Sequence, residues 1–202
     1  MTFLPLFRNT LAGLRVLIAI TILTGLIYPL AVLGVAQGVL PWHANGSLVA
    51  ADGSHTNSPA EAAGSVLIGQ EFAGPEWFHT RPSAAGEGWD TLASSGSNLG
   101  PESPDLIALI NERQAAVALE EGVSVTEVPA DAVTASASGL DPQISPAYAA
   151  LQASRVATER GLTSEDLEAL IAANTDDQTL GFLGEPRVNV VALNASLVAL
   201  TD

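Results

Sequence analysis

The side chains best suited to chemistry gather in the stretch TASASGLDPQIS, residues 134–145, just ahead of a predicted helix. Ser136 or Ser138 could act as a nucleophile, provided that a general base lay beside it. Gly139 and Asp141 complete a small-residue loop whose backbone N–H groups would suit an anion, and whose carbonyls would suit a cation. The same residues are also typical of a plain turn. Three interpretations are therefore open: a catalytic loop, an ion cradle and a turn.

The remaining composition argues against catalysis. A serine nucleophile needs a base, yet His43, His55 and His79 all precede residue 80, and none stands in a motif that places it. The chain of 202 residues has no lysine and no cysteine. Walker-type phosphate loops, Schiff-base chemistry, thiol catalysis and thiolate zinc sites are thereby excluded. We expect a non-catalytic chain with no metal site and no cofactor of its own, and a membrane-anchored serine hydrolase is the least favoured alternative.

A long apolar segment precedes these loops. Residues 16–33 carry no charged side chain, and roughly 20 apolar residues suffice to cross the hydrocarbon core of a bilayer. We predict a short N-terminus over residues 1–15 and a transmembrane helix over residues 16–40, in contact with lipid. A cleaved signal peptide is the competing interpretation, but apolar regions of signal peptides run only about 7 to 15 residues. Gly34 and Gly38 have the spacing that lets another helix approach closely, although glycine is common in membrane helices anyway.

The distribution of charge predicts an orientation. Arg8 and Arg15 precede the span, whereas residues 16–80 contain no basic side chain, so the positive-inside rule predicts a cytoplasmic N-terminus and an extracytoplasmic main domain. All 22 acidic residues lie beyond residue 51, where five arginines oppose them, for a charge of about −17. Nucleic acid is therefore not expected as a partner. The acidic excess favours a solubilising surface over the collection of cations, since screening acts within about 8 Å.

The segment beyond the span is expected to be of the α+β class. Residues 41–63 are rich in Gly, Ser, Asn and Ala and indicate a juxtamembrane linker, followed by a single domain over residues 64–202. Short apolar and β-branched runs predict strands at 64–72 and 123–128. Capping residues and prolines predict helices that begin after Ser103, Ser145 and Thr163, with ends at Gly122 and near Gly161, and a last helix capped by Asn189 in an otherwise ambiguous tail.

Two loops of the predicted domain repeat one pattern. SGSNLGP at 95–101 matches SASGLDP at 136–142 at both serines, the leucine and the proline, and each soon meets Ser-Pro at a helix start. Either two similar loop-helix units present these loops on one side of the domain, or the match reflects shared helix-start preferences and chance. The candidates for partner contact in these loops are Ser97, Asn98, Ser136, Ser138, Gly139 and Asp141.

Six ordered blocks resemble the C subunit of the Kdp-type potassium-transporting ATPase: GSVLIGQEF, WFHTRPSAAG, SSGSNLGP, VTASASGLDPQISP, QASRVATERGL and LGEPRVNVVALN. The resemblance covers nearly the whole chain from Arg15 onward. It implies an accessory subunit of a membrane pump, with a channel-like potassium-selecting subunit, a P-type ATPase subunit and a very small helical subunit as partners. Two roles are implied: assembly with a cap over the outer mouth of the channel-like subunit, or help in raising ATP affinity. ATP would then be reached through the complex.

For the ATP role the resemblance points to Gln152 and Arg155 of the QASRVA stretch, and Tyr148 shares their helical face. These side chains could stack on a base and contact phosphate, or they could form a packed face whose polar ends are satisfied within the domain. The predicted orientation opposes the first interpretation, because ATP is cytoplasmic. Gln143 stands where the family often has histidine, so no role that needs a titrating side chain there carries over.

The stretch WFHTRPS places Trp77, Phe78 and Arg81 close together in the sequence. Aromatic and arginine side chains concentrate binding energy at interfaces, so these three are candidates for a partner-facing anchor. The alternative is an aromatic pair in the core of the domain, with Arg81 bracing a loop. A free-standing extracytoplasmic ligand-binding module remains the alternative for the chain as a whole.

Overall fold

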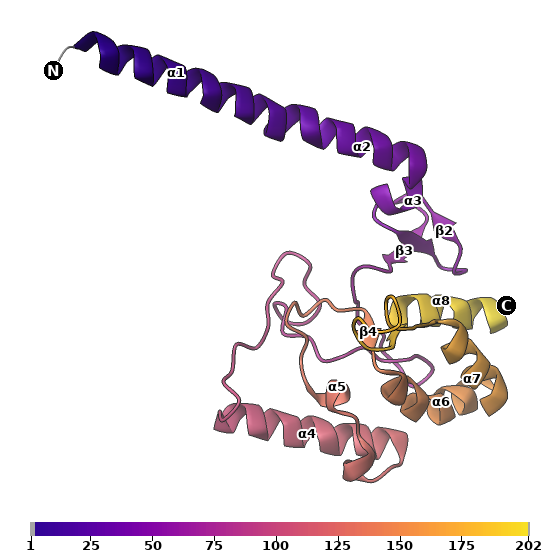
Figure 1. Ribbon diagram of the computed structural model, residues 1–202. Helices are drawn as coiled ribbons and strands as arrows, with labels where there is room; N and C mark the ends of the chain where they lie inside the picture. The colour runs from indigo at the N-terminus through magenta and orange to yellow at the C-terminus, as the bar shows by residue number, and fades with distance from the viewer. Residues whose placement is uncertain (1–2, 202) are drawn as a thin grey trace. The chain divides into compact units, whose positions relative to one another are not determined.

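The computed structural model describes residues 3–201, which divide into two compact units, one ending at Gly46 and one beginning at Ser47 (Figure 1). Residues 1 and 2 of the predicted N-terminal segment and residue 202 of the predicted domain lie outside the described range. The described part mixes helices with two small antiparallel sheets, so the predicted α+β class is confirmed.

The first unit is dominated by one apolar helical run. It comprises α1 (Phe3–Ile22), a π-helical turn (Leu23–Ile27) and α2 (Tyr28–Val39), together 37 residues with a mean hydropathy of 2.5 over the apolar window. At 1.5 Å per residue this is about 55 Å, more than the roughly 30 Å of a hydrocarbon core. The helix is thus long and apolar enough to cross a membrane, and it extends back through most of residues 1–15.

The π-helical turn has a local cause. Pro29 has no N–H to donate, and its ring crowds the carbonyl four residues earlier, so the wider turn just before it relieves the clash. After α2 the short helix α3 (Pro41–Ala44) is closed by Asn45, whose Nδ2 donates to the carbonyl of Pro41 at 2.7 Å. The side-chain amides of Asn45 and Gln37 also bond each other, at 3.1 and 3.2 Å. Side-chain hydrogen bonds of Asn45 and Gln37 therefore cap the end of the helical run.

The second unit opens with a small sheet. Strands β1 (Leu48–Ala50), β2 (His55–Thr56) and β3 (Ala62–Ser65) pair antiparallel in the order β2-β1-β3. Two of these strands lie inside the stretch 41–63 that was expected to be an irregular linker. The cause is the turn at 52–54, where Asp52 Oδ1 accepts from both N and Oγ of Ser54, which closes a hairpin that apolar periodicity does not announce.

The helices of this unit are α4 (Pro104–Glu121), α5 (Ala130–Val133), α6 (Pro146–Arg160), α7 (Ser164–Ala173) and α8 (Val190–Thr201). The four longer ones begin where the capping residues predicted. Ser145, Thr163 and Asn189 each accept a hydrogen bond from a first-turn N–H, whereas Ser103 makes no such bond. Gly122 and Gly161 end α4 and α6 in the left-handed conformation, as expected for glycine after a helix.

Both predicted strands need correction. Residues 123–128 form a 3-10 turn at Val125–Glu127, because Ser124 and Glu127 make a capping box in which each side chain bonds the other residue's backbone. Of residues 64–72 only the first two belong to β3. The chain then leaves the sheet, and the N–H of Gly69 donates to the carbonyl of Leu140 at 2.8 Å. In both places a local or tertiary hydrogen bond outweighs the apolar pattern.

A second sheet joins the end of the chain to its middle. Strands β4 (Gln143–Ile144), β5 (Thr175–Asp176) and β6 (Arg187–Asn189) pair antiparallel in the order β4-β6-β5. Figure 1 shows α6, α7 and α8 gathered on one side of the unit, with α4 below the loops. The core lies among these helices and the central strand β6, and its fully buried side chains include Phe78, Val156, Leu167, Val188, Leu193 and Leu197.

Candidate functional site

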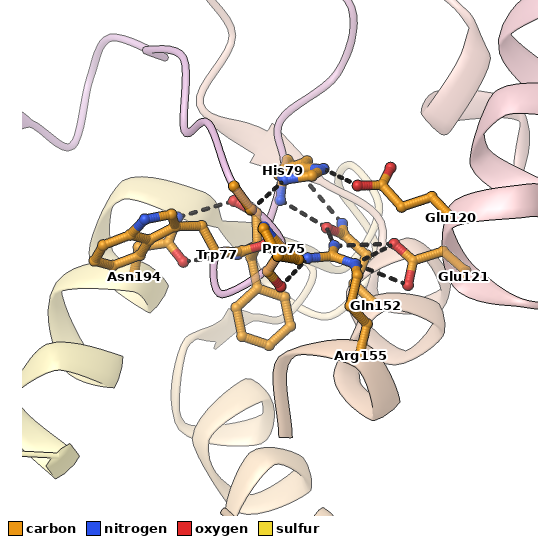
Figure 2. A network of polar contacts seen from close by, with 10 residues as sticks. Pro75, Trp77, His79, Glu120, Glu121, Gln152, Arg155 and Asn194 are labelled. Atoms are coloured by element: carbon orange, nitrogen blue, oxygen red, sulfur yellow. Dashed lines mark hydrogen bonds and ion pairs between the residues drawn. The ribbon is translucent and has the colours of Figure 1, made fainter. Parts of the chain in front are cut away.

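The residues selected by the family resemblance lie in a polar network inside the second unit (Figure 2). Gln152 and Arg155 stand one turn apart on α6. Both reach the irregular stretch at residues 74–80, which we call the clamped segment. This stretch makes no regular strand or helix, so most of its peptide groups lack backbone partners in a ladder and need others, here chiefly side chains.

Two side-chain amides hold consecutive residues of the clamped segment. Asn194 of α8 accepts from the N–H of Phe78 at 3.0 Å and donates to its carbonyl at 2.9 Å. Gln152 accepts from the N–H of His79 at 2.6 Å and donates to its carbonyl at 3.2 Å. Consecutive peptide groups of an extended chain face opposite ways, so each amide replaces a neighbouring strand on one edge. Gln152 and Asn194 are 0% and 1% exposed, and losing either would strand buried peptide groups.

Arg155 also bonds the backbone of the clamped segment. Its Nε and Nη2 bond the carboxylate of Glu121 at the end of α4, at 3.0 and 2.9 Å. Its Nη1 donates to the carbonyls of Pro75 and Trp77, the latter at 2.9 Å, and its Nη2 also donates to Gln152 Oε1 at 3.0 Å. The side chains of Arg155 and Glu121 are only 8% and 1% exposed. All three nitrogens of the guanidinium therefore donate hydrogen bonds to groups of the same domain.

Two further carbonyls of the clamped segment, those of Gly74 and Glu76, are also bound by side chains. The Nε2 of His79 lies 3.0 Å from the carbonyl of Gly74, and its Nδ1 lies 3.5 Å from Glu120. Arg160 Nε donates to the carbonyl of Glu76 at 3.1 Å, and its guanidinium carbon lies 4.2 Å from the centre of the Trp77 ring. Arg160 Nη2 is buried without a hydrogen-bond partner among the described residues, and the ring face gives this cation an attractive neighbour.

The buried ion pair shifts the acidity of Glu121. Burial raises the pKa of this carboxyl above its ordinary value of 4.5, although the hydrogen bonds and charge of Arg155 act in the opposite direction. Burial also raises the pKa of the Tyr148 hydroxyl, with the nearby carboxylates of Glu121 and Glu120 adding to the effect. Tyr148 is 4% exposed, so its ring presents no open face for stacking on a base.

The raised pKa predicts how stability depends on pH. A carboxyl whose pKa is raised by folding contributes stability below its unfolded pKa and loses that contribution as pH rises through the folded value. We therefore expect the melting temperature of the natural chain to fall relative to that of Glu121→Gln as pH rises from about 4 to about 7. Thermal melting of both chains in detergent across this range measures the difference.

Glu127→Gln is the matched control with the opposite sign. Hydrogen bonds from Ser124 lower the pKa of the exposed Glu127, so its contribution is present at neutral pH and is lost as pH falls. The melting temperature of the natural chain relative to Glu121→Gln could instead rise with pH, as expected for Glu127→Gln. In that case pairing with Arg155 outweighs burial, and the prediction of a raised pKa for Glu121 is wrong.

Phe78 and Arg81 lie where the second interpretation of the WFHTRPS stretch put them, in the core of the domain and against a loop. Phe78 is 0% exposed and belongs to the hydrophobic core, so its ring is unavailable to a partner in this structure. Arg81 donates to the carbonyl and hydroxyl of Thr134 at 3.3 Å and lies 3.6 Å from Asp141, so it braces the serine loop. Trp77 is half-buried beneath Arg160.

The two repeated loops lie against each other. Ser95 N donates to the carbonyl of Ser138 at 3.0 Å, and Ser94 Oγ donates to the same carbonyl at 2.9 Å. Gly139 has φ +68°, and a Cβ there would lie 2.6 Å from Ala85 N, so only glycine fits. Ser136 is buried and its N–H faces the carbonyl of Pro82. The loop at 136–142 is thus a turn that packs against the loop at 95–101. Ser97, Asn98 and Ser138 remain exposed on these two loops.

Sequence reasoning missed the partners that define the network, above all Asn194 and Glu121. A signal was present for the first: Asn194 is the single polar amide within the apolar run VVALNASLV, and a buried amide there must have hydrogen-bond partners. For Glu121 no local signal distinguishes it from Glu120 beside it. Only the approach of α6 to the end of α4 selects one carboxylate for the ion pair.

Fold and site together describe a protein with one helix long and apolar enough to cross a membrane and a compact mixed domain whose buried polar network holds the domain's own backbone. The family model for the "K+-transporting ATPase, c chain" matches residues 10–199. A potassium-transporting ATPase KdpC subunit of Beijerinckia indica is 53% identical over 183 residues, 91% of this chain and 89% of that protein.

Two further KdpC subunits show the same breadth of similarity. That of Kineococcus radiotolerans is 50% identical over 95% of this chain and 94% of its own length, and that of Mycobacterium tuberculosis is 48% identical over 94% and 97%. The chain belongs to the KdpC family, the C chain of K+-transporting ATPases. The resemblance carried by the six sequence blocks is thereby confirmed.

Proposed function

We propose that this chain is a non-catalytic accessory subunit that stabilises an ATP-driven potassium pump and covers the potassium entry side of its channel-like subunit. The observation that carries this proposal is that Gln152 and Arg155 form hydrogen bonds within the domain. Both are committed to the backbone of the clamped segment, with Arg155 also paired to Glu121. A rigid, internally satisfied domain suits docking to partners, whereas a nucleotide would have to displace these buried bonds.

The proposed topology supports the same role. Arg8 and Arg15 favour a cytoplasmic N-terminus, which would place the second unit on the outer side, away from cytoplasmic ATP. The helix would dock against partner helices through Gly34 and Gly38. These lie four residues apart on α2, on one face. Apart from their chain neighbours and the backbone of the same helix, no described atom comes within 4 Å of a Cβ built at either. The P-type ATPase subunit and the small helical subunit are the further partners in this proposal.

Deletion of the chain tests the accessory role. In cells that depend on this pump for potassium, we expect loss of growth at low potassium and loss of the assembled complex from detergent extracts. Restoring the full-length chain should restore both, while a chain lacking the helical run should restore neither. Normal potassium import by the remaining subunits alone would refute the proposal.

Sidedness decides between capping and the ATP role. The chain has no cysteine, so Ser97→Cys creates a unique label in an exposed loop. We expect a membrane-impermeant maleimide to label this variant in intact cells. Labelling only after the cells are broken would place the domain in the cytoplasm and would favour the role in ATP affinity, with Gln152 and Arg155 as its candidates. Denatured protein provides the control for complete labelling.

A further inference from the structure

The connection between β5 and β6 ends in a cluster of exposed apolar side chains. Leu180, Phe182 and Leu183 are 79%, 70% and 49% exposed. We call residues 178–184 the apolar hairpin. Single exposed apolar residues are ordinary on a protein surface, but three within four positions at the tip of one hairpin form a patch that water solvates poorly.

The apolar hairpin is ordered by its own hydrogen bonds. Thr179 and Leu183 exchange backbone bonds of 2.9 and 3.0 Å, and Gln178 Nε2 donates to the carbonyl of Gly184 at 2.8 Å. At its base, β5 pairs with β6, whose Val188 is 0% exposed in the core. The tip therefore presents its side chains from a rigid support, so that little conformational entropy remains to be lost on binding.

The backbone at the tip favours a role for its side chains. Leu180 has φ +57°, a left-handed conformation that a residue with a branched apolar side chain seldom adopts. Glycine or asparagine would satisfy this turn without strain. An exposed leucine in this conformation adds strain and buries little surface within the domain, which favours a contact outside the chain.

The charges around the tip select a protein over a bilayer. Asp176, Asp177 and Glu185 flank the apolar hairpin in the sequence. Arg187 lies 3.5 Å from Asp176, and Arg81 lines the same cavity as Glu185 and Arg187, so these three carboxylates still outnumber the nearby arginines. Segments that bind in a membrane interface are rich in basic residues on their polar side, which attract anionic lipids. Three carboxylates lack that attraction. They instead complement an apolar pocket rimmed by basic groups, the arrangement found where an anchor residue enters a partner.

We propose that the apolar hairpin is an anchor that inserts Leu180 and Phe182 into an apolar, basic-rimmed pocket on a partner subunit of the pump. This inference rests on the proposed function, since it requires the chain to assemble with other subunits. It adds the segment that makes the contact and the chemistry of the surface that receives it.

The test compares full-length chains that are co-expressed with the other pump subunits and purified in detergent. In the double variant Leu180→Asn/Phe182→Ser, asparagine suits the left-handed backbone, so the domain should melt as the natural chain does. We expect at least about a tenfold loss of the chain from the purified complex. Leu119→Ser is the matched control, because Leu119 is 85% exposed on α4 and should be removable without loss. Retention of the double variant at the natural level would overturn the anchor.

A photo-crosslinker separates the possible occupants. Benzoyl-phenylalanine placed at position 182 is expected to crosslink to one subunit of the pump. Crosslinks to lipid alone, or no crosslinks within a complex that otherwise assembles, would overturn the inference and leave the proposed function intact. If the natural chain itself does not co-purify with the other subunits, the proposed function fails and the anchor fails with it.

Discussion

Replacing Arg155 with methionine is expected to lower the free energy of unfolding by about 3 to 5 kcal/mol. The substitution leaves the carboxylate of Glu121, whose side chain is 1% exposed, buried without its counter-ion. It also removes the donor to the carbonyls of Pro75 and Trp77. Denaturant unfolding of the full chain in detergent, followed by tryptophan fluorescence, measures the loss, since Trp77 lies within the clamped segment.

A second substitution tests the cause. Arg155→Met combined with Glu121→Leu removes both charges and should recover the part of the lost stability that comes from the unpaired carboxylate, because a buried pair is often replaced by apolar side chains at little cost. The loss from the carbonyls of Pro75 and Trp77 should remain. Arg113→Met is the matched control on α4, where Nη1 of Arg113 donates a hydrogen bond to the carbonyl of Val133. If Arg155→Met leaves stability unchanged but abolishes stabilisation of the complex by ATP, Arg155 serves the nucleotide and the clamp interpretation is wrong.

Replacing Asn194 with leucine is expected to cost about 2 to 5 kcal/mol, although the two side chains are similar in size. Leucine packs in the apolar run of α8, but it leaves both the N–H and the carbonyl of Phe78 without their partner in the core. Each orphaned buried group carries the desolvation penalty that the amide now offsets. The same unfolding measurement reports this loss.

Asn174→Ala provides the comparison, because the Nδ2 of Asn174 bonds the carbonyl of Leu170 within its own helix end, and its Oδ1 accepts one longer bond, from Ser196 Oγ at 3.3 Å. Its effect should stay near 1 kcal/mol or below. Combining Asn194→Leu with Gln152→Leu should cost less than the sum of the two single changes, since releasing one edge of the clamped segment already frees the other. Strict additivity would contradict the idea that the two amides hold one segment.

Much of the secondary structure followed from neighbouring residues alone. Ser145 and Thr163 predicted helix starts because each side chain caps the first turn of the helix that follows, and Gly122 and Gly161 predicted ends because glycine accepts a left-handed backbone. The apolar helix was equally evident, since composition and length suffice to identify it. The stretch 123–128 misled because its capping box and its alternating apolar residues predict different structures.

The sequence by itself determined the family, the helical run and the caps, because these depend on residues within a few positions of one another or on ordered blocks of residues. It also singled out Gln152 and Arg155, but not what they bind. An amide and a guanidinium can bond either phosphate or peptide carbonyls. Only the tertiary structure, by bringing residues 73 to 116 positions apart into contact and excluding water from them, directs these side chains to the protein's own backbone.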